Sequence, residues 1–251
     1  MTSQTNSSNP DRRAFLKGAG IAAVAGAGGA IAPRSARAAV TGLRPHYGML
    51  IDLRKCTGCH ACSVSCKAEF DVPLGATRSW VEYVEKGDFP NVRRSFLPRL
   101  CNHCSKPQCV DVCPTGATWK RAEDGIVVVD PDICIGCKYC IQACPYDARF
   151  LNPVTGTADK CDFCLHRVSK GLEPSCVNTC IGRARIFGDL NDPGSEISKA
   201  IATNPVTVLR PEMGTEPNVF YIAADHADPH TSHTEGAYIR IDTHRRQQER
   251  K

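Results

Sequence analysis

Sixteen cysteines, arranged in four groups of four, constrain this 251-residue chain more than any other feature. Each group contains a C-x-x-C pair, then a third cysteine, then a fourth that follows the third after three residues. The groups are Cys56-x2-Cys59-x2-Cys62-x3-Cys66, Cys101-x2-Cys104-x4-Cys109-x3-Cys113, Cys134-x2-Cys137-x2-Cys140-x3-Cys144 and Cys161-x2-Cys164-x11-Cys176-x3-Cys180. No cysteine is left over, so the spacing should reveal what all of them bind.

Groups one and three match the C-x2-C-x2-C-x3-C run of bacterial ferredoxins, and groups two and four are the same run with an insertion. In such a run, three thiolates on a tight loop bind one [4Fe–4S] cluster, and the fourth binds the other cluster of a pair. Gly58 and Gly136 lie inside two of these loops, where a tight turn tolerates glycine best. The chain is therefore predicted to bind four [4Fe–4S] clusters.

Three other uses of these cysteines fit less well. Disulfides suit an exported chain with an even cysteine count, but C-x-x-C-x-x-C is poor disulfide geometry. Zinc sites use isolated C-x-x-C pairs, whereas a third cysteine follows here. Cys56 to His60 also reads as a C-x-x-C-H haem attachment site, but the longer run already uses both cysteines. His60 and His103 are accordingly predicted to be loop or solvent residues rather than ligands.

The connections between the groups predict how the cysteines pair. Asp124-Gly125 is a hairpin signal, Ile126–Val129 is a short β-branched strand, and Thr115–Trp119 is its predicted antiparallel partner. Groups two and three would then share one compact module, with groups one and four paired around it. The predicted ligand sets are Cys56, Cys59, Cys62 and Cys180 (cluster 1), Cys101, Cys104, Cys109 and Cys144 (cluster 2), Cys134, Cys137, Cys140 and Cys113 (cluster 3), and Cys161, Cys164, Cys176 and Cys66 (cluster 4).

The predicted fold class is α+β: a duplicated two-cluster ferredoxin fold in which one module is nested in the other, with long loops and an irregular C-terminal extension. Strands are predicted at Met49–Leu53 and Asp147–Leu151, and helices within 165–175 and at Ser195–Thr203. The long insertion 67–100, with Trp80 and Tyr83, either docks a partner or packs over group one. The predicted segments are an outer module at 39–100 and 153–190, an inner module at 101–152, an extension at 191–224 and a polar tail at 225–251.

The tail contains His226, His230 and His233, which could bind a metal, but its polar composition favours a disordered or partner-ordered segment.

The N-terminus is predicted to be an export signal. Arg12-Arg13 is followed by Phe-Leu-Lys, then by the Gly/Ala-rich run Gly18–Ala32, and then by an A-x-A cleavage site that ends at Ala38. This order resembles a twin-arginine signal, which exports proteins that have already folded around a cofactor. The apolar run is too short for a confident membrane span. Residues 1–38 would therefore be removed, and the mature chain would be periplasmic.

Charge argues against nucleic acid as a partner. The net charge is +5, and most of the excess lies in the predicted signal. An oxidised [4Fe–4S] cluster with four thiolates carries a charge of about −2, so bound clusters would make the mature chain acidic. Basic residues beside the motifs are predicted to offset part of this charge, namely Arg54, Lys55, Lys67, Lys160 and Arg167.

With these motifs in hand, the chain resembles the four-cluster electron-transfer subunits of molybdopterin oxidoreductases. Dimethyl sulfoxide, polysulfide and tetrathionate reductases and the formate-dependent nitrite reductase system have such subunits. The resemblance covers residues 46–222. The phrases that carry it are Met49–Cys56, Leu97–Cys104, Asp124–Asp130, Ala143–Phe150, Thr157–Cys164 and Val206–Thr215.

The resemblance implies a non-catalytic relay. Electrons would pass from a quinol-oxidising membrane anchor subunit, through the clusters, to a molybdopterin catalytic subunit. Val206–Thr215 favours a tetrathionate reductase over the polysulfide, dimethyl sulfoxide and nitrite systems. Some hydrogenase subunits share the four groups but carry a C-terminal membrane helix, whereas this chain ends in polar residues. A free periplasmic ferredoxin and a structural or sensory iron–sulfur module are the alternatives from other classes.

Overall fold

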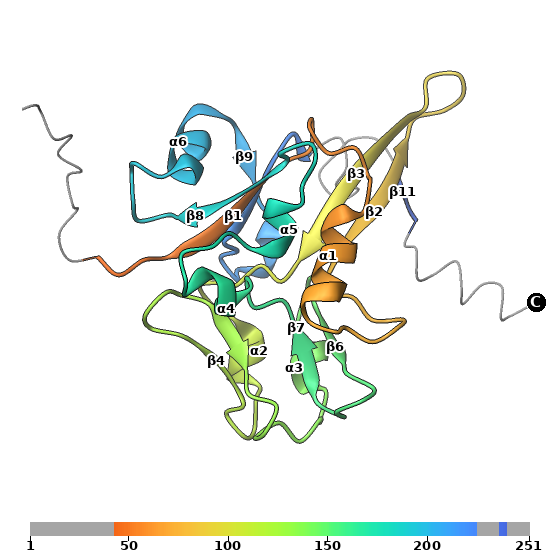
Figure 1. Cartoon of the computed structure of the whole chain (residues 1–251). Helices are drawn as coiled ribbons and strands as arrows, with labels where there is room; N and C mark the ends of the chain where they lie inside the picture. Colours follow the sequence, from red (N-terminus) through yellow and green to blue (C-terminus); the bar gives the residue numbers. More distant parts are fainter. Residues whose placement is uncertain (1–42, 225–235, 240–251) are drawn as a thin grey trace, which may run out of the picture. The chain divides into compact units, whose positions relative to one another are not determined.

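A computed structural model describes residues 43–224 and 236–239 of the chain (Figure 1). The predicted signal residues Arg12, Arg13 and Ala38 lie outside the described residues, and so do the three histidines of the tail. Within the described ranges, no helix combines the length and the apolar character needed to cross a bilayer.

The described residues form short helices and small, mostly antiparallel sheets, which fits the predicted α+β class. The helices are α1 (Ala61–Glu69), α2 (Gln108–Asp111), α3 (Tyr139–Gln142), α4 (Leu165–Val168), α5 (Ser175–Asn178) and α6 (Glu196–Thr203), with a 3-10 turn η2 (Pro211–Met213). The strands are β1 (Tyr47–Asp52), β2 (Ser79–Lys86), β3 (Arg93–Leu100), β4 (Thr118–Lys120), β5 (Val127–Val129), β6 (Arg149–Leu151), β7 (Ala158–Lys160), β8 (Arg185–Asp189), β9 (Val206–Thr207), β10 (Val219–Ile222) and β11 (Gly236–Ile239).

The largest sheet has the strand order β8-β1-β10-β9, with β1 parallel to β10 and antiparallel to β8. Alternate residues of β1 enter two different cores. Leu50 packs with Ile197 of α6 and with Ile222, whereas Met49 and Ile51 face the core that contains the cysteines. Both faces of β1 are therefore covered, which is why its sequence is a continuous apolar run.

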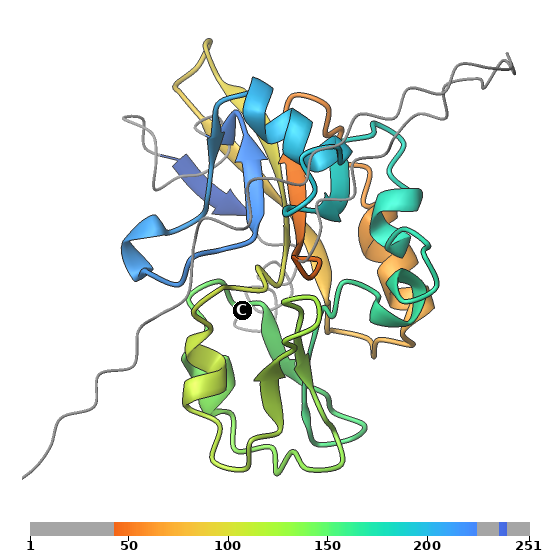
Figure 2. The same cartoon turned by 90° about the vertical axis from the view of Figure 1, so that its left-hand side faces the viewer.

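Two small hairpins connect the cysteine groups (Figure 2). β4 pairs with β5 between groups two and three, and β6 pairs with β7 between groups three and four. The predicted pairing of β4 with β5 is confirmed, but the first strand starts at Thr118 rather than Thr115. The reason is local: Gly116 has φ +69° and still belongs to the turn that follows Cys113.

Residues 67–100 contain the antiparallel hairpin β2–β3, which the sequence analysis did not predict. Its register runs from Ser79 opposite Leu100 to Lys86 opposite Arg93, and β11 pairs with the other edge of β2. Trp80 packs against the main core. The hairpin thus favours local packing over partner docking for this part of the insertion.

The other predicted elements appear with small shifts at their ends. β1 spans Tyr47–Asp52 instead of Met49–Leu53, and β6 begins at Arg149. α4 lies in the insertion of group four, as predicted. α6 begins after Ser195, whose hydroxyl oxygen accepts a hydrogen bond from the Ser198 amide at 3.2 Å and caps the helix.

Helices that carry cysteines pack in two pairs. α1, which contains Cys62 and Cys66, packs against α5, which contains Cys176. α2, which contains Cys109, packs against α3, which contains Cys140. The fold thus brings group one beside group four, and group two beside group three.

Candidate iron–sulfur sites

Four cysteines from distant parts of the chain line one small cavity. Three come from group one and the fourth comes from group four. The rest of the wall comes from the β2–β3 hairpin and the segment that leads into β8. The cysteines are Cys56, Cys59, Cys62 and Cys180, the set predicted for cluster 1.

A second cavity has the same composition. Three cysteines of group two and the last cysteine of group three line it, together with side chains such as Tyr146 and Arg149. The cysteines are Cys101, Cys104, Cys109 and Cys144, the set predicted for cluster 2.

The cysteines predicted for cluster 4 are buried and mutually close. Burial raises the pKa of the Cys66 thiol to about 12, and the neighbouring Cys176 and Cys164 contribute to the increase. Burial also raises the pKa of Cys161, for which Cys66 and Cys176 are the strongest electrostatic neighbours. These four thiols therefore interact with one another.

The set predicted for cluster 3 is more exposed than the sets for clusters 2 and 4, and it is as exposed as the set for cluster 1. Cys140 is buried, Cys113 and Cys134 are half-buried, and Cys137 is exposed. No cavity or thiol–thiol interaction found among the described residues joins these four side chains, so their predicted grouping stays a prediction.

Most of the buried thiols hold their protons at neutral pH when no metal is present. Burial raises the pKa of Cys104 to about 12 and that of Cys109 to about 11. Metal binding to thiolates must therefore release protons from these sites. Cys113 differs, because amide and hydroxyl donors from Thr118 and Thr115 outweigh its desolvation and lower its pKa.

Backbone amides point at several of the sulfur atoms. The amide of Ala158 donates to Cys134 Sγ at 3.4 Å, and the amide of Ala184 donates to Cys180 Sγ at 3.3 Å. Phe163 donates in the same way to Cys161 Sγ at 3.4 Å. Such hydrogen bonds to sulfur are one means by which proteins set cluster potentials.

The four motif loops share one backbone conformation. The residue before the second cysteine has a positive φ in every group: Gly58 (+71°), His103 (+43°), Gly136 (+68°) and Phe163 (+54°). Glycine is favoured there because a side chain strains this conformation. The two non-glycine residues stack on each other, with ring centroids 3.7 Å apart.

Gly136→Ala is expected to cost about 1–3 kcal/mol more stability than Gly116→Ala, because a Cβ at 136 would overlap the Gly156 carbonyl oxygen. Gly116 is the matched control: its φ of +69° is nearly the same as the +68° of Gly136, but open space surrounds it. Chemical denaturation of both variants with their iron bound measures the difference. Equal losses would show that only the backbone angle matters.

His103 lies in a loop, one of the two predicted alternatives, but it is not exposed to solvent. It is completely buried against Phe163, and burial lowers its pKa well below the usual value. Its Nδ1 accepts a hydrogen bond from the Val127 amide at 3.1 Å, so the neutral ring carries its proton on Nε2. Nε2 has no hydrogen-bond partner among the described residues. The alternative of a solvent position is wrong because the stacking partner, Phe163, comes from group four, far along the chain.

His60 is also more enclosed than predicted. It is half-buried, and its Nε2 lies 2.6 Å from the hydroxyl of Tyr83. That hydroxyl also approaches the Gly58 carbonyl at 3.3 Å. The pair ties the first motif loop to β2, so Tyr83 has a local packing role.

The basic residues predicted to offset cluster charge have mixed positions. Arg54 and Lys55 pair with Asp52, and Arg167 pairs with Glu69. Lys67 donates to backbone carbonyls of the loop after α1. Lys160 is the exception, since it is buried and donates to the Val127 and Cys161 carbonyls.

Sequence reasoning missed two buried cations that contact cysteine sulfur, Arg149 and Arg185. Both lie five residues after the last cysteine of a group, at Cys144 and Cys180, and both follow an alanine. This repeated position is a signal that could have identified them.

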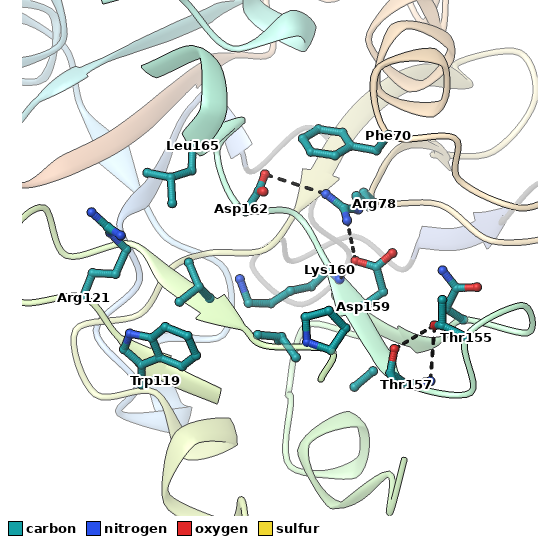
Figure 3. Close-up of a pocket in the computed structure, with 15 residues that line it drawn as sticks. Phe70, Arg78, Trp119, Arg121, Thr155, Thr157, Asp159, Lys160, Asp162 and Leu165 are labelled. Atoms are coloured by element: carbon teal, nitrogen blue, oxygen red, sulfur yellow. Dashed lines mark hydrogen bonds and ion pairs between the residues drawn. The ribbon is translucent and has the colours of Figure 1, made fainter. Parts of the chain in front are cut away.

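A larger cavity of about 430 Å³ lies apart from the cysteine sets (Figure 3). Arg78, from the loop after α1, reaches Asp159 at 2.7 Å and Asp162 at 3.7 Å across one side of it. Phe70 lies under the same guanidinium at 3.9 Å. These contacts fasten the segment after group one to β7 and the start of group four.

The donor sets fit iron–sulfur clusters. Each of the two cavities is lined by four thiols. The one other histidine or carboxylate side chain in either lining is His60, whose Nε2 is hydrogen-bonded to the Tyr83 hydroxyl. Backbone amides and buried arginines stabilise negative charge on sulfur. No three His, Cys, Asp or Glu side chains among residues 43–224 and 236–239 converge as ligands of a single metal ion would.

Comparison with known proteins gives a consistent result. The 4Fe-4S dicluster domain matches twice, over residues 55–118 and 92–190. The B subunit of tetrathionate reductase from Salmonella typhimurium is 54% identical over 188 residues, which cover 73% of this chain and 75% of the relative. Protein NrfC of Escherichia coli is 44% identical, covering 84% of this chain and 94% of the relative. The iron-sulfur B subunit of a putative dimethyl sulfoxide reductase from Halobacterium salinarum is 42% identical, covering 70% and 79%.

The fold, the thiol sets and these matches define an iron–sulfur protein built from 4Fe-4S dicluster domains. More particularly, the chain belongs to the family of iron–sulfur electron-transfer subunits of molybdopterin oxidoreductases.

Proposed function

We propose that this chain relays electrons through four [4Fe–4S] clusters from a quinol-oxidising membrane anchor subunit to a molybdopterin catalytic subunit, and that it catalyses no substrate reaction itself. The observation that carries the proposal is that two cavities are each lined by three cysteines of one group and one of another. This is the shared-ligand pattern of paired clusters. Bound clusters would supply one-electron exchange.

The proposed ligand sets are those predicted from the sequence. The cavity linings support the sets of clusters 1 and 2, and the mutual effects of the buried thiols support the set of cluster 4, Cys66, Cys161, Cys164 and Cys176. The packing of α1 on α5 and of α2 on α3 supports a nested pair of ferredoxin modules. The set of cluster 3, Cys113, Cys134, Cys137 and Cys140, completes the proposal by elimination.

The exposed face around cluster 3 suits contact with another protein chain. Cys137 is exposed, and large apolar side chains flank these cysteines in the sequence. Ile135 is 67% exposed and Tyr139 is 61% exposed. Exposed apolar residues at a redox ligand favour a protein partner, because an interface would bury them and bring a second cofactor close.

Tetrathionate is the proposed substrate of the catalytic partner, because a tetrathionate reductase relative is 54% identical to this chain. The test is anaerobic isolation of the native complex through a tag on this chain, followed by metal analysis and oxidation of reduced viologen by tetrathionate. We expect molybdenum, about 16 iron atoms per chain for four [4Fe–4S] clusters, and turnover.

Each failure has a separate meaning. Molybdenum and iron without tetrathionate turnover would reject the substrate, and polysulfide, dimethyl sulfoxide and nitrite would then be assayed. A preparation with iron but without molybdenum or a membrane subunit would support a free ferredoxin instead. A preparation without iron would reject the relay.

The proposed location is the periplasm, with attachment to the membrane through partner subunits. The support is the sequence of residues 1–38, in which Arg12 and Arg13 precede an apolar run and the cleavage site at Ala38. Lysine at both arginine positions should retain the chain in the cytoplasm, which fractionation would reveal. Unchanged periplasmic recovery would reject twin-arginine export.

A further inference from the structure

Two buried arginines occupy equivalent positions in the two halves of the fold. Arg149 starts β6, five residues after Cys144, and Arg185 starts β8, five residues after Cys180. Their exposed fractions are 5% and 3%. Each guanidinium contacts cysteine sulfur and also a serine or threonine hydroxyl.

Arg185 lies between cysteines of two different proposed clusters. Its Nη2 is 3.5 Å from Cys62 Sγ, and its Nη1 is 3.7 Å from Cys176 Sγ. Nη2 also donates to Ser79 Oγ at 3.0 Å, which fixes the orientation of the guanidinium. Cys62 belongs to the proposed set of cluster 1 and Cys176 to that of cluster 4.

Arg149 has the corresponding surroundings. Its Nη2 donates to Cys109 Sγ at 3.0 Å, and its Nη1 donates to Thr118 Oγ1 at 3.1 Å. Cys101 of cluster 2, the same proposed set, lines one cavity with Arg149, and α3, which contains Cys140 of cluster 3, packs against β6, which begins at Arg149. Arg149 therefore also faces two proposed clusters.

Neither guanidinium has a carboxylate within 4 Å among the described residues, unlike the buried Arg99, which pairs with Glu82 at 3.0 Å. Arginine keeps its charge in proteins, and burying an uncompensated charge is very costly. The titratable groups that act on Arg149 are cysteines, and those that act on Arg185 are three cysteines and the Tyr221 hydroxyl, which donates to the Pro98 carbonyl. Their positive charges therefore require negative charge on the cysteine sites.

We propose that Arg149 and Arg185 are positioning residues that set cluster potentials, each as a fixed positive charge shared by the two clusters of one pair. Adding an electron makes a cluster more negative, and a nearby buried cation favours that form. Each arginine should raise the potentials of two clusters and reduce the repulsion between them. The inference rests on the proposed function, because it requires the clusters to be bound.

The test is a redox titration of the isolated complex, followed by electron paramagnetic resonance, with Arg185→Gln, Arg185→Lys and Arg149→Gln. The neutral variant at 185 should lower the potentials of two clusters. We expect at least about a tenfold change in the one-electron reduction equilibrium, which is about 59 mV. Arg185→Lys should restore most of the lost potential, and Arg149→Gln should lower the potentials of the other two clusters. The control is Arg183→Gln, which removes an exposed charge two residues from Arg185 and should leave all four potentials unchanged.

Unmoved potentials in Arg185→Gln with its iron retained would overturn the inference. If that variant loses iron, Ser79→Ala decides: loss of the orienting hydrogen bond should lower the same two potentials by a smaller amount, and no change would overturn the inference. Wild-type complex without cluster signals would instead overturn the proposed function. The two failures are therefore distinguishable.

Discussion

Removing the iron with a chelator, under anaerobic and reducing conditions, is expected to unfold residues 101–180 while part of the β8-β1-β10-β9 sheet stays structured. The segment 101–180 contains α2, α3, α4 and α5, each four residues long. Helices of this length are not stable by themselves, and they depend on packing around the cysteines that would bind metal. Binding energy at such sites counts directly as folding energy.

Three features make the expected loss of folded structure on iron removal large. Cys101, Cys161 and Cys176 are part of the main core, so the clusters replace hydrocarbon there. Aromatic residues make up only 6% of the chain, so little other bulk is available to fill that core. Without clusters, Arg149 and Arg185 would also remain buried without counter-charge. In contrast, Leu50, Ile197 and Ile222 form a separate apolar core that contains no cysteine.

Hydrogen exchange read by mass spectrometry would measure the unfolding of residues 101–180 and the persistence of the β8-β1-β10-β9 sheet in one experiment. Protection should disappear across 101–180 and persist in β1 and β10. A sample treated with iron-saturated chelator controls for effects of the chelator itself. Unchanged protection across 101–180 after complete iron removal would contradict this account, because it would mean that the fold does not depend on metal.

Arg99→Met is expected to destabilise the protein by about 3–5 kcal/mol, because it removes the buried guanidinium that contacts both oxygens of the buried Glu82 carboxylate. Arg99 contacts both carboxylate oxygens of Glu82, at 3.0 and 3.1 Å, and donates to the Tyr146 carbonyl at 2.9 Å. The Trp80 indole also donates to Glu82, at 2.9 Å. The glutamate is completely buried. For a chain of this size the midpoint of thermal unfolding should fall by about 6–20 °C.

The same hairpin offers a matched control. Arg94 pairs with Glu85 across β2 and β3, but this pair is open to solvent, so Arg94→Met should cost no more than about 1 kcal/mol. Thermal unfolding at one scan rate compares the two variants. Adding Glu82→Gln to Arg99→Met should recover part of the loss, because it removes the buried charge. Equal losses at 94 and 99, or no recovery, would contradict the assignment.

Local sequence signals predicted several elements well. The Asp124-Gly125 turn located the pairing of β4 with β5, and the helix predicted at Ser195–Thr203 is observed as α6, Glu196–Thr203. The hairpin β2–β3 was not predicted, because β3 contains one β-former, Phe96, and a proline at position 98. Its alternation is also disguised because the charged residues Glu82 and Arg99 are buried, where they pair with each other. A pattern within one segment cannot reveal a partner in another.

The cysteine spacing alone identified the candidate cluster ligands, because the spacing within each group is local and sets how many thiols one loop can present. The connections between the groups also predicted which distant cysteine joins each loop, and the tertiary structure lines one cavity with Cys180 and Cys56 and another with Cys144 and Cys101. The tertiary structure decided which charged and ring side chains are buried beside the sulfurs. Those outcomes depend on the packing of segments far apart in the chain, and no local spacing encodes that packing.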